Sequence, residues 1–405
     1  MAYTLITSLG TGMHKQEGYQ KTKYIIDEKR NFTTRLFMEA LLQCSYRAVN
    51  QVILIGTNTS SWDVLVECKN DYEKKFWDRL LHKDGNLSEE LKSELEKYLK
   101  ERFKIPFIIK VHTDSVDENH IPELFDCYSS IYQLINEGND ILFDITHGFR
   151  SMPMLVYQAL QYHFIDTPER KVELVYGEYK KEEGVAPIRN LSEYWRYSQI
   201  SAALHLFQQK LDGFTLAELI KDEWPNGARA IKALSDIAQT NFALRFPEVL
   251  VQIHDALENT PKNAPEWIEK IKETLKKVEN LKDEKSTART LCKYSKYLYD
   301  LNLNTQAIIT LQNCIETAMA EKFGDEKSIG DYDWWTEAGK NKFNYASGKT
   351  GTYVTLKDLE YFRNSVAHAG GRNPETKEFP STDSMPDIYK QGLDSAEKLL
   401  DFLEL

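Results

Sequence analysis

The sequence predicts an α/β fold followed by an all-α fold. In the first half, short apolar runs that fit buried strands alternate with segments of helical periodicity. This alternation is typical of a mainly parallel, doubly wound sheet. After about residue 190 the strand-like runs stop, and long segments with a period near 3.6 residues follow one another. We therefore expect a Rossmann-like domain over residues 1–190 and a helical region over residues 191–405.

Composition narrows the class of protein. The 405 residues are 41% hydrophobic and 28% charged, which is enough to give each of two domains a core. No apolar run approaches the roughly 20 residues of a membrane span and no signal peptide is evident, so we expect a cytoplasmic protein. The five cysteines and nine histidines lack metal-site spacing, so we expect reduced thiols and no metal or cofactor. The net charge of −11 argues against non-specific coating of nucleic acid.

The first two predicted strands end in polar loops. A strand over residues 3–8 is followed by Gly10, Thr11 and Gly12. This lone G-x-G lacks the third glycine and the immediate helix of a dinucleotide-binding fingerprint. A second strand over residues 51–55 ends in a polar turn that includes Thr57 and Asn58.

The other elements of the first domain alternate in the same way. We expect helices over residues 31–43, 71–103 and 122–136, and strands over residues 107–111 and 171–176, with a hairpin closed by residues 184–188. The charged segment 71–103 is interpreted as an insertion on the outside of the sheet.

A strand–turn–helix unit lies at the centre of the domain. Residues 141–145 fit a buried parallel strand, and a helix is expected after Pro153. The turn between them contains Thr146, His147, Gly148, Arg150 and the potential N-cap residue Ser151. Ligands bind at the carboxyl ends of such strands, and a guanidinium beside helix-start amides suits a phosphate. The alternative is that these polar residues only cap the helix.

The second half consists of predicted helices. Their ranges are 192–211, 214–222, 226–239, 244–258, 264–279, 285–301, 303–321, 356–369 and 386–404. A second group of functional side chains, Arg363, Asn364 and His368, lies in the last turns of the helix that ends near Gly370. The R-x-x-x-x-H spacing is common by chance. The alternative is an arginine on the helix surface and a histidine that is favoured at the C-terminus by the helix dipole.

These side chains suit RNA cleavage. RNA carries its own nucleophile, the 2′-hydroxyl, so cleavage needs proton transfer and stabilisation of charge on the phosphate. A histidine can transfer the proton, a guanidinium can hold the phosphate, and Asn364 can orient either group. No metal is required. Because one arginine and one histidine make a sparse active site, a two-fold dimer that joins two copies is expected.

At this point both halves resemble the CRISPR-associated CARF–HEPN ribonucleases, the accessory RNases of type III systems. Residues 3–12 look like the opening strand and loop of that family, and residues 144–151 look like its sensor-domain motif. Residues 363–368 match the short form of its catalytic R-x4–6-H pattern. The resemblance covers the whole chain.

The resemblance implies a Rossmann-like CARF domain that binds a cyclic oligoadenylate across a homodimer interface, and a HEPN domain that cuts single-stranded RNA in antiviral defence. The activator would be a cyclic tetra- or hexa-adenylate. The implied ligand-binding residues are Gly10, Thr11, Gly12, Thr57, Asn58, Thr146, His147, Gly148, Arg150 and Ser151. The implied catalytic residues are Arg363, Asn364 and His368.

Two other classes of protein compete with this interpretation. One is a ligand-sensing CARF regulator or scaffold with a non-catalytic helical effector domain, although no basic helix-turn-helix pattern supports a DNA-binding effector. The other is a nucleotide-dependent Rossmann enzyme, which the incomplete glycine pattern and the missing acidic ribose partner disfavour.

Overall fold

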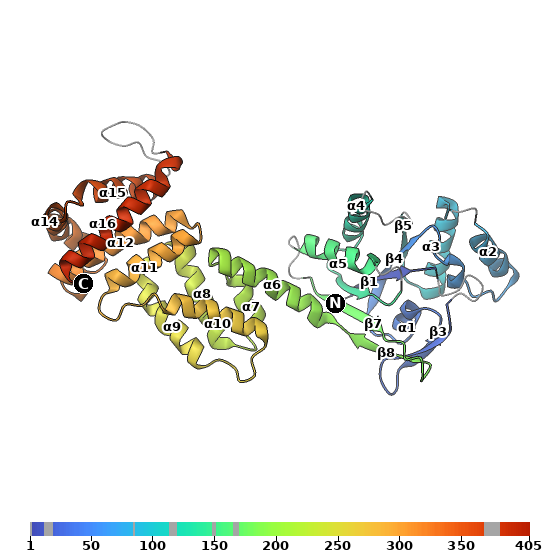
Figure 1. Cartoon of the computed structure of the whole chain (residues 1–405). Coiled ribbons are helices and arrows are strands. Elements are labelled where there is room, and N and C mark those ends of the chain that lie inside the picture. Colours follow the sequence, from blue (N-terminus) through green and yellow to red (C-terminus); the bar gives the residue numbers. More distant parts are fainter. Residues whose placement is uncertain are drawn as a thin grey trace. The chain divides into compact units, whose positions relative to one another are not determined.

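The computed structural model describes residues 2–11, 19–83, 86–112, 120–147, 151–164, 170–367 and 381–405. The chain divides into two compact units, Met1–Tyr197 and Ser198–Leu405 (Figure 1). Helix α6 (Ser192–Lys210) contains the division, because Trp195 in its first turn packs into the core of the N-terminal unit. Among the described residues, no helix combines the length and hydropathy needed to cross a membrane.

Within the described ranges, eight strands form one sheet in the order β3-β2-β8-β7-β6-β1-β4-β5. The strands are β1 (Tyr3–Leu9), β2 (Thr22–Ile25), β3 (Asn31–Thr34), β4 (Val49–Thr57), β5 (Phe107–His112), β6 (Asp140–Asp144), β7 (Val172–Gly177) and β8 (Val185–Asn190). The five strands from β7 to β5 pair in parallel, while β8 runs antiparallel to β7. The predicted mainly parallel sheet is confirmed.

Helices cover both faces of this sheet. They are α1 (Phe37–Gln43), α2 (Asp71–Leu81), α3 (Glu89–Phe103), α4 (Ile121–Tyr132) and α5 (Ser151–Phe164). Side chains of α1, α2 and α3 share one core with Leu5 and Leu54, and side chains of α4 and α5 share the other with Ile6 and Phe143. The alternating orientation of side chains along each strand supplies both cores.

Two sequence-based expectations for this unit are corrected. The helix expected to begin at residue 31 begins at Phe37, because Asn31–Thr34 pairs with β2 as a short antiparallel strand. The segment 71–103 is not an insertion outside the sheet. Phe76 and Leu80 on α2, with Leu95 and Leu99 on α3, are buried in the core, so this segment forms the crossover between β4 and β5.

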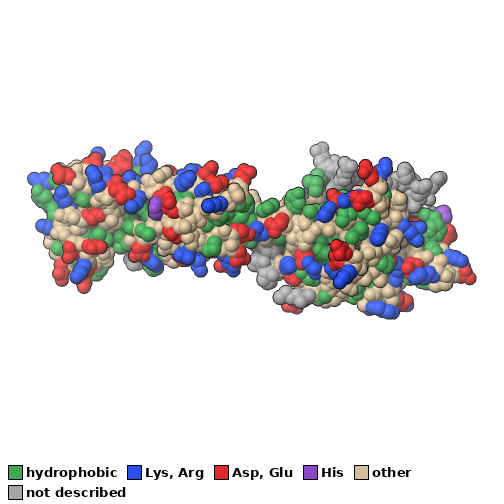
Figure 2. Space-filling view, turned by 90° about the horizontal axis from the view of Figure 1, so that it is seen from below, with side chains coloured by type: hydrophobic (Ala, Val, Ile, Leu, Met, Phe, Trp, Pro, Cys, Tyr) green, Lys and Arg blue, Asp and Glu red, His purple; other side chains and the backbone are tan. Residues whose placement is uncertain are grey.

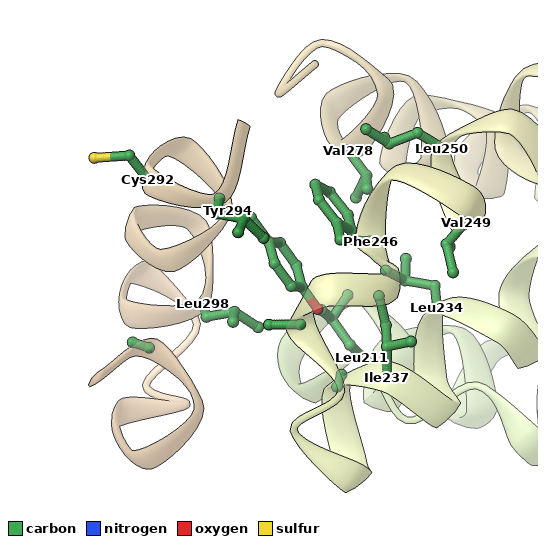
Figure 3. Packing of buried hydrophobic residues seen from close by; sticks show 14 of the residues in the cluster. Leu211, Leu234, Ile237, Phe246, Val249, Leu250, Val278, Cys292, Tyr294 and Leu298 are labelled. Carbon is green, nitrogen blue, oxygen red and sulfur yellow. The ribbon is translucent and has the colours of Figure 1, made fainter. Parts of the chain in front are cut away.

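The described part of the C-terminal unit is helical, as the sequence predicts. Its helices after α6 are α7 (Phe214–Ile220), α8 (Pro225–Thr240), α9 (Phe246–Glu258), α10 (Glu266–Glu279), α11 (Thr287–Asp300), α12 (Asn304–Phe323), α13 (Tyr332–Trp334), α14 (Lys340–Thr350), α15 (Tyr353–Ala367) and α16 (Met385–Leu403). The rings of Phe246 and Tyr294 stack at 3.8 Å among the aliphatic side chains of the core (Figure 3). Helix α14 was not expected from the sequence.

Gly56 provides a test of packing at the end of β4. A Cβ atom there would lie 2.6 Å from the ring of Trp62, which is fully buried. We expect Gly56→Ala to lower the free energy of unfolding by about 1–3 kcal/mol, as overpacked core sites do. In Gly348→Ala, the contrasting variant, the added Cβ meets nothing within 4 Å and should stabilise α14 by roughly 0.5–1 kcal/mol. Urea unfolding of both proteins measures the two effects, and equal shifts would contradict the packing argument.

Candidate functional site

The topology makes the carboxyl ends of β1 and β6 the candidate position for ligand binding. These two strands are neighbours, and the crossovers on their two sides use opposite faces of the sheet: α1, α2 and α3 cover one face and α4 the other. This is the topological switch point at which open α/β sheets bind ligands. The residues that follow β1, β4 and β6 are therefore the candidates for ligand contact.

Asp144, the last residue of β6, joins the two strands at this point. Its side chain is fully buried, Oδ2 accepts a hydrogen bond from Thr7 Oγ1 on β1 at 2.6 Å, and Oδ1 accepts one from the Thr146 amide at 2.7 Å. Burial raises the pKa of Asp144 to about 6, although the hydrogen bonds act in the opposite direction. Sequence analysis did not assign Asp144 to the site, because an aspartate that ends an apolar strand gives no sign of its distant partner.

His147 caps the start of α1. Its Nε2 atom accepts a hydrogen bond from the Phe37 amide at 3.2 Å and lies 3.4 Å from the Tyr24 hydroxyl. Helix α1 has no capping side chain of its own, so the imidazole satisfies one of its free amides. Burial lowers the pKa of His147 to about 4. The ring is therefore neutral near pH 7, with its proton on Nδ1.

Two tyrosines connect this turn to the loop after β1. The Tyr19 hydroxyl accepts a hydrogen bond from the Gly10 amide at 2.7 Å, and its ring packs edge-on against His147 at 4.9 Å. Burial raises the pKa of Tyr19 to about 12 and that of Tyr24 further. Gly177 packs against the same residues. A Cβ atom at this position would lie about 3.1 Å from the Tyr24 ring, and the Gly177 amide donates a hydrogen bond to Thr146 Oγ1. Sequence analysis did not identify either tyrosine.

The turn after β4 holds the same loop from the other side. Ser60 Oγ donates to the Leu9 carbonyl at 2.7 Å, and Ser61 binds the Gly10 and Thr11 carbonyls through its amide and hydroxyl. Of the residues named from the sequence, Thr57 is buried inside this turn.

Asn58 and Thr11 differ from Thr57 in their exposure. Asn58 is half-buried and accepts a hydrogen bond from the Leu87 amide, while Thr11 is exposed. The structure thus brings the loops after β1, β4 and β6 together.

Several predicted residues lie outside the described ranges. They are Gly12, Gly148, Arg150 and His368. Ser151 is the first residue of α5.

The helical unit holds Arg363 and Asn364 on α15. Arg363 Nη1 donates to Asn364 Oδ1 at 2.9 Å, and its Nε is buried without a hydrogen-bond partner among the described residues. Glu316 on α12 lies in electrostatic range of Arg363. Burial raises the pKa of the Glu316 carboxyl, while a hydrogen bond from Gln312 at 3.0 Å and the charge of Arg363 act to lower it. A guanidinium that keeps an unsatisfied donor can bind an anion.

No group of three or more histidine, cysteine, aspartate or glutamate side chains that could hold a metal ion occurs among the described residues. The described polar partners of His147 are the Phe37 amide and the Tyr24 hydroxyl.

The pKa shifts of Asp144 and His147 predict opposite effects of pH on the free energy of unfolding. The folded-state pKa of Asp144 is above its ordinary value of 3.8, so its contribution falls as pH rises from about 4 to 6. The folded-state pKa of His147 is below 6.5, so its contribution grows as pH rises through the same range. Relative to the natural chain, Asp144→Asn should gain about 2 kcal/mol in unfolding free energy between pH 4 and pH 6, and His147→Gln should lose unfolding free energy. Urea unfolding across this range tests the signs, and two parallel profiles would contradict the assignment.

Three comparisons relate the chain to known proteins. Residues 4–179 match the family model described as CRISPR system endoribonuclease Csx1, CARF domain. CRISPR-associated protein MJ1674 of Methanocaldococcus jannaschii is 24% identical over 403 residues, which cover 91% of this chain and 62% of that protein. The chain thus spans less than two thirds of the length of this relative. Among solved structures, Enterococcus italicus Csm6 bound to cyclic hexa-2′-fluoro-hexa-dAMP aligns with 100% of this chain and 95% of its own, with a TM-score of 0.41 and 11% identity. The N-terminal unit therefore contains a CARF domain similar to that of the Csx1 endoribonucleases, and the chain is similar over most of its length to a CRISPR-associated protein.

Proposed function

We propose that the N-terminal unit binds a cyclic oligoadenylate and that binding activates the helical unit as a metal-independent endoribonuclease. The observation that carries the proposal is the cluster of polar loops at the switch point of a CARF domain. Single-stranded RNA is the substrate, and antiviral defence in the cytoplasm is the setting. The five cysteines, all free thiols, fit that compartment.

The ligand side of the proposal assigns phosphate and base contacts to different groups. Arg150 and the amides that start α5 at Ser151 supply positive charge for phosphates. Thr11, Asn58 and the Nδ1 proton of His147 supply neutral polar contacts. A ring of four or six adenylates has rotational symmetry that suits a pocket shared by two copies of the chain.

The nuclease side uses Arg363, Asn364 and His368 in a HEPN-type site. The 2′-oxygen attacks phosphorus, the bond to the 5′-oxygen breaks, and the product strand ends in a 2′,3′-cyclic phosphate. His368 transfers a proton, Arg363 holds the phosphate oxygens and Asn364 orients the guanidinium through their hydrogen bond. Two copies of these residues in a homodimer would complete the site.

Activation requires differential binding. The activator must bind the active arrangement of the dimer more tightly than the resting one, because equal affinity for both leaves the populations unchanged. Arg150 lies some 200 residues before His368 in the sequence and acts only through the ligand.

Arg150→Ala tests the sensor. Loss of a charged phosphate contact should weaken cyclic oligoadenylate binding at least about tenfold, and the activator concentration for half-maximal cleavage should rise equally. Arg189→Ala on β8, which removes an exposed ion pair with Glu178, is the matched control and should bind normally. Calorimetry and cleavage titrations with the cyclic tetra- and hexa-adenylates measure both quantities. Unchanged curves for Arg150→Ala would mean that the turn after β6 only caps a helix.

His368→Ala tests the nuclease. Removal of the proton-transfer group should reduce RNA cleavage by about 10² or more and leave activator binding intact. Cleavage by the natural chain should persist in EDTA. Cleavage unaffected by the substitution, or abolished by EDTA, refutes the mechanism. Absence of cleavage in the natural chain with every activator would favour the alternative of a ligand-sensing scaffold.

A further inference from the structure

One segment of the helical unit has a charge unlike that of the whole chain. From Lys340 to Lys357 the sequence contains four lysines and no aspartate or glutamate, whereas the chain as a whole has 62 acidic and 51 basic residues. On the face of the molecule shown in Figure 2, acidic and basic side chains are interspersed. The segment forms α14 and the first turn of α15. It is therefore a local basic region in an acidic protein.

The lysines and a tyrosine of α14 share one face. Lys342, Tyr345 and Lys349 are spaced three and four residues apart, which places them in a row along the helix, and all three side chains are exposed. Tyr345 is 58% exposed, and Lys349 Nζ lies 5.8 Å from the centroid of its ring. Lys342 Nζ lies 5.4 Å from the ring of Phe323, which is 37% exposed. Neither lysine forms an ion pair with another described residue.

The other side of α14 packs into the core, and the start of the helix lies in electrostatic range of Glu316, as Arg363 does. Phe343 is buried and contacts Tyr353 at the start of α15, with ring centroids 6.2 Å apart. Lys340, at the start of α14, and Arg363 both lower the pKa of the Glu316 carboxyl, so the two cations lie in range of one carboxylate. Along α15, Tyr353 precedes Arg363 by ten residues, or about 15 Å.

We propose that the face of α14 formed by Lys342, Tyr345 and Lys349 binds single-stranded RNA and holds the strand beside Arg363. The inference rests on the proposed function, because it names where the substrate of that site binds. Proteins bind single strands by combining cations for the backbone with exposed aromatic rings on which unpaired bases stack. The bases of a duplex are already stacked and paired, so this face does not suit double-stranded RNA.

A protein partner fits this face less well. Lysine is depleted from the cores of protein–protein interfaces, and here two unpaired lysines flank the exposed ring. Burial of these ammonium groups against a second copy of an acidic chain would require matched carboxylates, which the segment 340–357 does not itself contain.

RNA binding can be measured apart from cleavage. The probe is a fluorescent 12-nucleotide 2′-O-methyl RNA, which lacks the free 2′-hydroxyl and is not cut, and the protein is the full chain. The double variant Lys342→Glu with Lys349→Glu should raise the Kd at least about tenfold. It should also reduce the slope of log K against log salt by about 1.4, the value for two lost phosphate contacts on a single strand. Tyr345→Ala should raise the Kd about tenfold, and Tyr345→Phe should restore binding because the ring is kept.

The matched control is Lys276→Glu with Lys277→Glu on α10, which reverses two exposed lysines elsewhere in the same unit and should leave the Kd unchanged. Equal RNA affinity of the α14 variants and the natural chain overturns the proposal, even if His368→Ala abolishes cleavage. Selective loss of RNA binding supports it, even if the natural chain proves not to be a nuclease. Light scattering measures the oligomeric state of the same variants. A changed oligomeric state with unchanged RNA affinity would overturn the proposal and show that the face joins two copies of the chain.

Discussion

The buried carboxylate of Asp144 fixes the geometry of the candidate ligand site. Its oxygens accept hydrogen bonds from the Thr7 hydroxyl on β1 and from the Thr146 amide, so the strands on both sides of the switch point are joined at their carboxyl ends. No described cation forms an ion pair with it. A buried carboxylate is costly unless its oxygens are hydrogen-bonded, and any relaxation of the turn after β6 would unpair one of them. The position of His147, and through it of α1, depends on this constraint.

The same carboxylate determines what the site can offer a ligand. It raises the pKa of Tyr19 and Tyr24 beyond the effect of burial, and His147 is neutral because of burial. The described groups around His147 are therefore neutral donors and aromatic rings next to one buried acid. A polyanionic ligand needs compensating positive charge from elsewhere, and Arg150 with the start of α5 is the part of the motif that can provide it. Under the proposed function, the neutral donors contact the bases and riboses of the ligand.

Sequence patterns predicted those parts of the structure that are local. The strand Asp140–Asp144 and the helix Ser151–Phe164 follow each other closely in the sequence, so apolar periodicity identified both. Tyr19, Tyr24 and Asp144 were not assigned to the site because their contacts join segments more than 100 residues apart, which periodicity does not report. Helix α14 was missed because Lys340–Thr350 is rich in lysine and asparagine and contains a glycine near its end. Only Phe343, Ala346 and Ser347 are buried along it, so its amphipathic signal is weak. For the same reason the sequence did not reveal the exposed row on its other side.

Among the described residues, the guanidinium of Arg363 on α15 keeps one donor free for an anion such as a phosphate. One of its donors is satisfied by Asn364, whereas the buried Nε has no partner among the described residues. An unsatisfied buried donor costs roughly 1–3 kcal/mol, and an anionic ligand that accepts from it removes that cost. Glu316 does not take this role, because it lies in electrostatic range of Arg363 without forming an ion pair and accepts instead from Gln312. A phosphodiester can satisfy both the charge and the free donor, and its demand for both increases as negative charge develops on its oxygens. The arrangement on α12 and α15 therefore favours an anionic ligand over a neutral ligand of the same size.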